Sequence, residues 1–203
     1  MGNGKNDQFN KYISIVLVIV IVCVTGIYTY TQLVEKDPTD HNNYQPTGDS
    51  ENTILNVTMG SDITSYTLDE LKSIGVVSGN GAYVNKIGKV TGPNDYTGIP
   101  ITSLLDSIDN IPDNYTVQAT ASDDYSVEYS YSEVNGEVKI YNETGVEIGT
   151  SMITMIIAYK ENGNLIDEDN GGPLRIAFID EEGSITGSGK WLQSLVNLEV
   201  IES

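Results

Sequence analysis

The chain has 203 residues, which allows one domain of ordinary size with additional segments. It carries 10 Lys and Arg against 29 Asp and Glu, a formal net charge of −19. Such an acidic surface repels phosphates, so the charge excludes nucleic acid as a general partner and fits a solvated surface domain.

An uncharged apolar run over residues 12–30 predicts a single transmembrane helix. At about 1.5 Å per residue such a helix would reach roughly 28 Å, close to the hydrocarbon thickness of a bilayer. Lys5 and Lys11 precede the run and mostly acidic residues follow it, so positive charge stays on the cytoplasmic side. We therefore expect a short cytoplasmic tail over residues 1–11 and an extracellular C-terminal domain.

This apolar run has two other interpretations. A cleaved signal peptide needs a small-x-small site after the apolar segment, and none follows it cleanly. A lipoprotein leader would end at Cys23, but the residues before it, Val20–Val22, are larger than such processing accepts. The uncleaved anchor is favoured, with Cys23 as a structural thiol in lipid.

A polar segment over residues 31–52 contains Pro38 and Pro46 and shows no apolar period. This composition predicts a flexible stalk between the membrane and the domain. The single histidine of the chain, His41, falls in this stalk, where we expect a solvated side chain rather than a metal ligand.

Three N-x-[ST] sequons, at Asn56, Asn114 and Asn142, lie after the predicted anchor, and none lies before it. No cysteine follows Cys23, so no disulfide can staple the outer domain. N-glycosylation without disulfides fits an archaeal cell surface best. The expected protein is a single-pass glycoprotein of the cell membrane.

Residues 53–203 alternate between short strand and helix patterns, which predicts a globular domain. Its first helix is expected where Thr67 is followed by Glu70 at the spacing of a capping box, and should end near Gly75. A Gly-rich stretch, residues 78–82, lacks the spacing of a phosphate-binding loop and predicts a plain turn.

A second helix is expected over residues 99–108, with Pro100 near its first turn, where a missing N–H costs nothing. Two Asn-Gly pairs, at 135–136 and 162–163, predict β-hairpins. Alternating or apolar runs predict strands over residues 54–58, 86–90, 115–120, 125–131, 152–159, 174–179 and 195–201. Many strands with two or three short helices imply a mixed α+β domain.

Two surface features have competing interpretations. Tyr125, Tyr129 and Tyr131 would share one face of a strand; such a row could be a carbohydrate platform, but cross-strand packing is favoured. The acidic loop over residues 167–170 lacks the spacing of an EF-hand, and a looser calcium site that shares Asp180, Glu181 or Glu182 is the alternative left open.

Three motifs follow one another along the domain. They are G-x-P-hydrophobic-x-x-L-L within residues 96–105, A-S-D-x-Y-S within residues 119–131, and a closing run over residues 156–201 that includes G-G-P-L-R and K-W. In this order they resemble the oxidoreductase molybdopterin-binding domain, the fold that carries the cofactor in sulfite oxidase. The resemblance implies a sulfite-oxidase-type α+β fold with mixed sheets and a few short helices.

The resemblance also implies a set of cofactor-binding positions. Arg175 matches an arginine that family members use against the pterin or its phosphate, and Lys190 with Trp191 matches the K-W pair. Asn170 stands where the family commonly has a histidine, and Gly172 lies in the adjacent G-x-P element. An arginine fork and a lysine charge suit a phosphate. The alternative is that Arg175 pairs with a nearby carboxylate and Trp191 belongs to the core.

The G-G-P-L-R element is expected to form an unusual turn. One of its glycines, Gly171 or Gly172, should adopt a backbone conformation closed to other residues. Pro173 should then lead into a buried strand in which Leu174 and Ile176 do not both face the core.

In catalytic members of the family a cysteine thiolate binds molybdenum about a dozen residues before the G-x-P element. The matching window, residues 82–90, contains no cysteine or histidine. Molybdenum prefers a deprotonated sulfur, as other soft metals do. We therefore predict no catalytic residue, no metal ligand and no bound cofactor. The family resemblance alone implies molybdopterin as a cofactor.

These inferences favour a membrane-anchored cell-surface protein that is non-catalytic and acts as a binding module for a partner protein, a glycan or a small ligand. The alternative is a molybdopterin-dependent oxidoreductase or a subunit of a membrane redox complex. A structural component of the cell envelope is the third interpretation.

Overall fold

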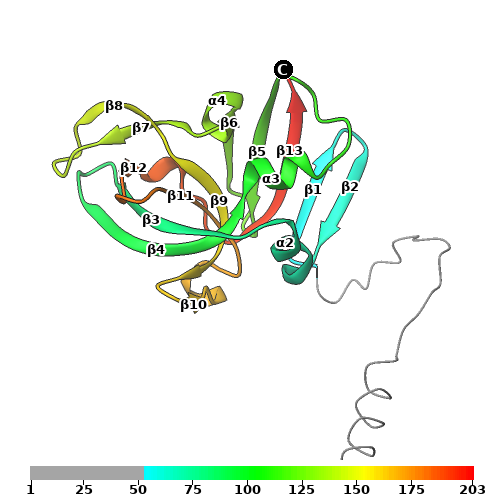
Figure 1. Ribbon diagram of the computed structural model, residues 1–203, viewed down its shortest axis with the longest axis horizontal. Helices are drawn as coiled ribbons and strands as arrows, with labels where there is room; N and C mark the ends of the chain where they lie inside the picture. The colour runs from blue at the N-terminus through cyan, green and yellow to red at the C-terminus, as the bar shows by residue number, and fades with distance from the viewer. Residues whose placement is uncertain (1–52) are drawn as a thin grey trace, which may run out of the picture. The chain divides into compact units, whose positions relative to one another are not determined.

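The computed structural model describes residues 53–203. The predicted tail, anchor and stalk, with Cys23 and His41, lie outside these residues and stay predictions. Residues 53–203 form two β-sheets, with three short α-helices and two 3₁₀ turns between the strands (Figure 1). Within this range no helix has the length and apolar composition needed to cross a bilayer.

Five strands form the first sheet: β1 (Leu55–Met59), β2 (Asp62–Tyr66), β5 (Tyr115–Ala121), β6 (Ser126–Ser130) and β13 (Leu195–Glu202). Their order in the sheet is β2-β1-β13-β5-β6. β1 pairs in parallel with β13, and the other neighbours are antiparallel. The last strand of the chain therefore joins the first hairpin to the middle of the domain.

The second sheet has eight strands: β3 (Val77–Val84), β4 (Val90–Pro100), β7 (Glu137–Tyr141), β8 (Glu147–Met152), β9 (Thr154–Glu161), β10 (Asn164–Leu165), β11 (Arg175–Ile179) and β12 (Ile185–Gly187). Their order is β10-β9-β4-β3-β12-β7-β8, and β11 also pairs with β9. β12 runs parallel to β3, so this sheet is mixed as well.

Short helical elements connect the strands. They are α2 (Leu68–Ile74), α3 (Ile101–Asp106), α4 (Tyr131–Val134), and the 3₁₀ turns η1 (Glu168–Asn170) and η2 (Ser188–Lys190). The predicted first helix is confirmed as α2, because Thr67 and Glu70 make both hydrogen bonds of the capping box and Gly75 ends the helix. The mixed α+β architecture with a few short helices is confirmed too.

Both sheets contribute to one hydrophobic core. Val117 and Leu198 from the five-stranded sheet pack in the same buried cluster as Ile157 and Phe178 from the eight-stranded sheet. The strand β11 is buried along its whole length, because its other face, with Ala177, lies in a second apolar cluster. A continuous apolar run is the pattern expected of a strand covered on both faces.

The buried strand β11 corrects one expectation. Leu174 and Ile176 both belong to the main core cluster and are fully buried. The expectation that they would not both face the core was therefore wrong. The preceding turn behaves as predicted, since Gly171 adopts a left-handed conformation with φ of 80°.

The Gly-rich stretch over residues 78–82 is not a turn but the middle of β3. A Cβ atom on Gly81 would lie 2.5 Å from the carbonyl oxygen of Phe178 and 2.9 Å from the indole of Trp191. Glycine is therefore required by the close approach of other segments rather than by a chain reversal. The true turn follows β3 at residues 85–89, so β4 begins only at Val90.

Two predicted helix and hairpin positions also shift. Pro100 is the last residue of β4, and the second helix is shorter than expected because it begins at Ile101. Asn135 ends the helix α4 instead of forming a hairpin between two strands. The pair at 162–163 does form the predicted hairpin between β9 and β10.

The expected row of tyrosines on one strand face does not form. Ser130 and Glu133 make a second capping box, which starts the helix α4 and turns Tyr131 out of the strand. Tyr129 is fully buried, whereas Tyr125 precedes β6 and is 58% exposed. The Ser-x-x-Glu signal for α4 was present in the sequence.

Candidate functional site

A pocket of about 500 Å³ opens where the first residue of β11, the segment after η2, the end of β3 and the β5–β6 turn meet. Aromatic, hydroxyl, amide and charged side chains all contribute to its wall. The lining residues are Tyr83, Ala121, Ser122, Asp123, Tyr125, Arg175, Ile176, Ser188, Trp191, Leu192, Gln193 and Ser194. Of the four predicted cofactor-binding residues, Arg175 alone is among them.

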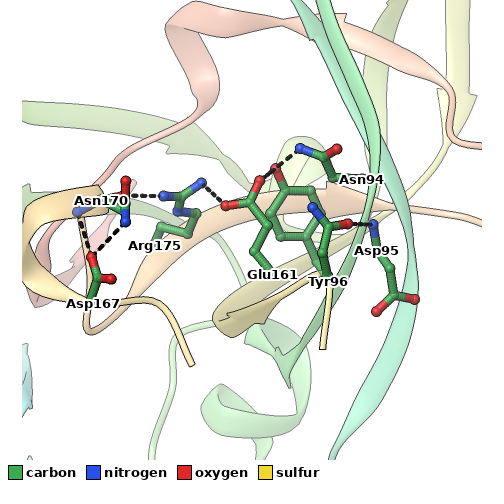
Figure 2. Close-up of polar contacts among 8 residues, drawn as sticks. Asn94, Asp95, Tyr96, Glu161, Asp167, Asn170 and Arg175 are labelled. Carbon is green, nitrogen blue, oxygen red and sulfur yellow. Dashed lines mark hydrogen bonds and ion pairs between the residues drawn. The ribbon is translucent and has the colours of Figure 1, made fainter. Parts of the chain in front are cut away.

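Arg175 is held from two sides by the protein itself. Its Nη1 atom lies 3.0 Å from Oε2 of Glu161, and its Nη2 atom donates to the backbone carbonyl of Asn170 (Figure 2). The side chain is only 7% exposed. A buried guanidinium needs such partners because an uncompensated buried charge is costly. Its Nε atom is buried and has no hydrogen-bond partner within residues 53–203.

Glu161 is the centre of this polar network. Its Oε1 atom accepts hydrogen bonds from the hydroxyl of Tyr96, at 2.9 Å, and from Nδ2 of Asn94, at 2.7 Å (Figure 2). Burial, with a further contribution from Glu161, raises the pKa of Tyr96 to about 12, so this phenol stays protonated and donates. Both oxygens of Glu161 are therefore engaged, and Arg175 faces a preorganised partner.

Asn170 and Gly172 shape the turn before β11. The backbone N–H and the side-chain amide of Asn170 both donate to Oδ1 of Asp167, at 2.9 and 2.8 Å. A Cβ atom on Gly172 would lie 2.2 Å from the carbonyl oxygen of Ile166, so this position has no room for a side chain. These contacts hold the loop 167–172 and aim the Asn170 carbonyl at Arg175. Only the backbone of Asn170 acts on the arginine.

Lys190 is paired as well, away from Arg175. Its Nζ atom lies 2.7 Å from Oε1 of Glu133 and donates to the carbonyl oxygen of Glu128 at 2.9 Å. Burial alone would raise the pKa of Glu133, but the hydrogen bonds from Lys190 and from the backbone of Ser130 outweigh burial and lower this pKa. The ammonium also lies over the ring of Tyr129, 5.3 Å from its centroid.

Trp191 is fixed at the wall of the pocket by its neighbours. Its indole N–H donates to Oγ1 of Thr186 at 2.7 Å, and its ring packs 5.0 Å from Tyr83 and 5.4 Å from Tyr96, measured between centroids. Gly81 provides the space that this indole occupies. The sequence singled out Trp191 but missed Tyr83, and the two strand glycines beside Tyr83 were the available signal of a close approach.

Other pocket residues come from two loops, and the first of them carries the A-S-D-x-Y-S motif noted in the sequence. Asp123 lies in the β5–β6 turn, where its Oδ1 atom accepts the backbone N–H of Tyr125 at 3.1 Å. Gln193 and Ser194 follow Trp191 and precede β13. The pairing of β5 with β13 brings these two loops together, which local sequence patterns do not reveal.

The donor set does not fit molybdenum. Residues 53–203 contain no cysteine and no histidine. Within the same range no three acidic side chains gather closely enough to hold a metal ion. Oδ1 of Asp180, in the looser calcium site left open above, accepts the backbone N–H of Ser184 at 3.0 Å, and hydrogen bonds of this kind overcome burial to lower the Asp180 pKa.

The cations do not fit a pterin phosphate either. Arg175 and Lys190 would have to leave Glu161 and Glu133 to bind one, and each pair is held by further hydrogen bonds. The alternative interpretation of Arg175, that it pairs with a carboxylate of the chain, describes the observed geometry.

The three sequons occupy different environments. Asn114 lies on an exposed loop before β5, and Asn142 is partly buried at the β7–β8 turn, where Oδ1 accepts from Thr144. Asn56 lies in β1, between two other strands, and its Oδ1 atom accepts a hydrogen bond from Ser65 at 2.8 Å.

Comparisons with known proteins give a family and a fold. A family model described as the oxidoreductase molybdopterin binding domain matches residues 55–201. Among solved structures, the sulfane dehydrogenase SoxCD from Paracoccus pantotrophus is similar, with a TM-score of 0.54 at 12% identity. The alignment covers 73% of this chain and 38% of that one, and at this identity it shows the fold alone. No curated protein matches the chain by sequence.

Proposed function

The chain belongs to the oxidoreductase molybdopterin-binding domain family, and from that premise we propose that it keeps the family fold as a non-catalytic binding module. One observation carries the proposal. The two cations that the resemblance assigns to the pterin, Arg175 and Lys190, are each neutralised by a carboxylate of the chain, and residues 53–203 offer no thiolate or imidazole. Residues 53–203 would therefore keep the fold of the family without the side chains that bind its cofactor.

The ligand would enter the pocket beside Arg175. The volume of this pocket, about 500 Å³, lies in the range of small-molecule sites, and its lining combines aromatic side chains with a few polar groups. Arg175 forms part of this wall and orders the loop 167–172 behind it rather than presenting a free charge.

We place the module outside the cell, anchored by the apolar run over residues 12–30. The charge difference across that run, the sequons after it and the strongly acidic composition support this placement. Protease added to intact cells should remove the domain over residues 53–203. Protection in intact cells, with loss only after lysis, would contradict the placement.

The test of the non-catalytic role is a redox assay on the full chain purified from its native membrane. We expect no sulfite-dependent reduction of an artificial electron acceptor, because residues 53–203 contain no ligand set for the metal. Turnover that follows the protein through purification would overturn the proposal. It would favour the alternative, an oxidoreductase or a subunit of a membrane redox complex that holds the cofactor without a thiolate.

A further inference from the structure

The pocket beside Arg175 has a rigid aromatic wall. Trp191 is held by Thr186 and by the tilted ring of Tyr83, as described above, and the ring of Phe178 packs against it at 6.3 Å between centroids. Tyr125 stands at the opening and is 58% exposed. Aromatic faces carry partial negative charge, so they attract C–H groups that carry partial positive charge.

Apart from Arg175, the polar residues of the lining carry no positive charge. Asp123, Gln193 and three serines are among them, and together they offer carboxylate, amide and hydroxyl groups. An amide and a hydroxyl each donate and accept, whereas a carboxylate accepts only. One oxygen of Asp123 holds the backbone of Tyr125, which fixes the orientation of the carboxylate.

The charge balance disfavours an anionic ligand. Within the part of the chain that the structure describes, Arg175 is the one cation that lines this pocket, and Glu161 already neutralises it. Asp123 adds a negative charge at the opening, and the whole chain is strongly acidic. An oxyanion would therefore meet a neutral to negative field.

We infer that this pocket binds a neutral saccharide, an inference that rests on the proposed binding function. A sugar ring presents an apolar C–H face, which suits Trp191 and Tyr83, and a rim of hydroxyls, which suits Asp123, Gln193 and the serines. The pocket volume of about 500 Å³ matches roughly one or two sugar rings. The carbohydrate platform suggested by the tyrosine row is thus replaced by a concave site.

The chain carries its own probe for this inference. Trp191 is the single tryptophan of the sequence, so intrinsic fluorescence reports this wall of the pocket directly. The full chain in detergent would be titrated with glucose, galactose, mannose, N-acetylglucosamine and their disaccharides, and separately with sulfate and phosphate. We expect a saturable change with at least one neutral sugar, at a Kd of roughly 1 mM or below. Because no ion pair forms, this Kd should not depend on salt.

Matched variants separate the pocket from the surface beside it. Asp123→Asn should weaken sugar binding by about tenfold, since a charged acceptor is lost from the wall. Asp124→Asn makes the same charge change on the next residue, which is outside the pocket lining, and should leave binding unchanged. Asp124 has a positive φ of 67°, a conformation that asparagine tolerates.

The outcomes distinguish a failure of the saccharide assignment from a failure of the proposed binding function. A salt-dependent response to sulfate or phosphate, with none to any sugar, would overturn the saccharide assignment and leave a non-catalytic binding module standing. Absence of a response to every sugar, or equal effects of the two aspartate variants, would also contradict the assignment. Sulfite turnover by the native protein would overturn the proposed function itself, independently of the fluorescence result.

Discussion

Arg175 and Glu161 form an ion pair in which Nη1 lies 3.0 Å from the carboxylate, with the arginine 7% and the glutamate 25% exposed. The pair joins the start of β11 to the end of β9, and its arginine lines the pocket. Removal of either partner would leave an uncompensated charge in a buried environment.

Breaking this ion pair should destabilise the domain. Glu161→Gln leaves a buried charge without its counter-ion, so we expect a loss of about 2–3 kcal/mol in the free energy of unfolding, measured by urea denaturation. The exposed pair Lys139–Glu147 provides the control, and Glu147→Gln should leave the free energy of unfolding almost unchanged. Equal losses in the two variants would mean that the Arg175 pair is not a special feature of the site.

Gly81 should not accept a side chain. Gly81→Val would force a Cβ against the carbonyl of Phe178 and the indole of Trp191, and we expect a loss of roughly 2–4 kcal/mol in the free energy of unfolding. The fluorescence of Trp191 should shift as well. Gly189→Ala is the matched control, because a Cβ there meets nothing within 4 Å. A stable Gly81→Val protein with unchanged fluorescence would contradict the packing described for the pocket wall.

In the first half of the domain, local sequence patterns predicted one element correctly and another wrongly. Thr67 with Glu70 predicted the start of α2 correctly because both capping hydrogen bonds form within four residues. Residues 78–82 were misread because a cluster of Gly, Asn and Ser usually marks a turn. In β3 they instead admit Phe178 and Trp191, which lie about a hundred residues later in the sequence, and no local pattern carries that information.

The candidate site likewise contains residues that the sequence identified and residues that it did not. The resemblance identified Arg175, and the sequence allowed for a carboxylate partner, but 29 acidic residues were available. Glu161 is selected because the register of β4 with β9 places it opposite Tyr96, while Arg175, opposite Ala158 on β9, reaches it with its side chain. Asp123 and Gln193 come to line one pocket through the pairing of β5 with β13, a long-range contact.

Acid should selectively remove the contribution of Glu133. Its pKa in the folded state is lower than the ordinary value of 4.5, so its pairing with Lys190 stabilises the fold above that value and is lost as the pH falls through the folded-state pKa. Glu133→Gln should therefore be less stable than the unchanged chain at neutral pH, and the difference should shrink below about pH 4.5. Urea denaturation across this range measures it, with Glu143→Gln on an exposed turn as the control. A difference that grows on acidification would contradict the assigned pairing.

Glycosylation should favour Asn114. This residue lies on an exposed loop, whereas Asn56 lies within a strand that has neighbours on both sides and is bonded to Ser65. An oligosaccharide on Asn56 would have to displace that contact at a half-buried position. Mass spectrometry of peptides from the natively produced protein would read each site. Occupancy at Asn56 with none at Asn114 would contradict the prediction.

Molybdenum content tests directly whether the chain carries the cofactor of its family. The full chain would be purified from its native membrane under mild conditions, and molybdenum would be measured per chain by elemental analysis, with pterin absorbance recorded on the same sample. We predict molybdenum far below one atom per chain and no pterin, because residues 53–203 have no cysteine thiolate and both candidate phosphate-binding cations are paired. Stoichiometric molybdenum with a pterin signal would contradict this prediction and make the protein an oxidoreductase.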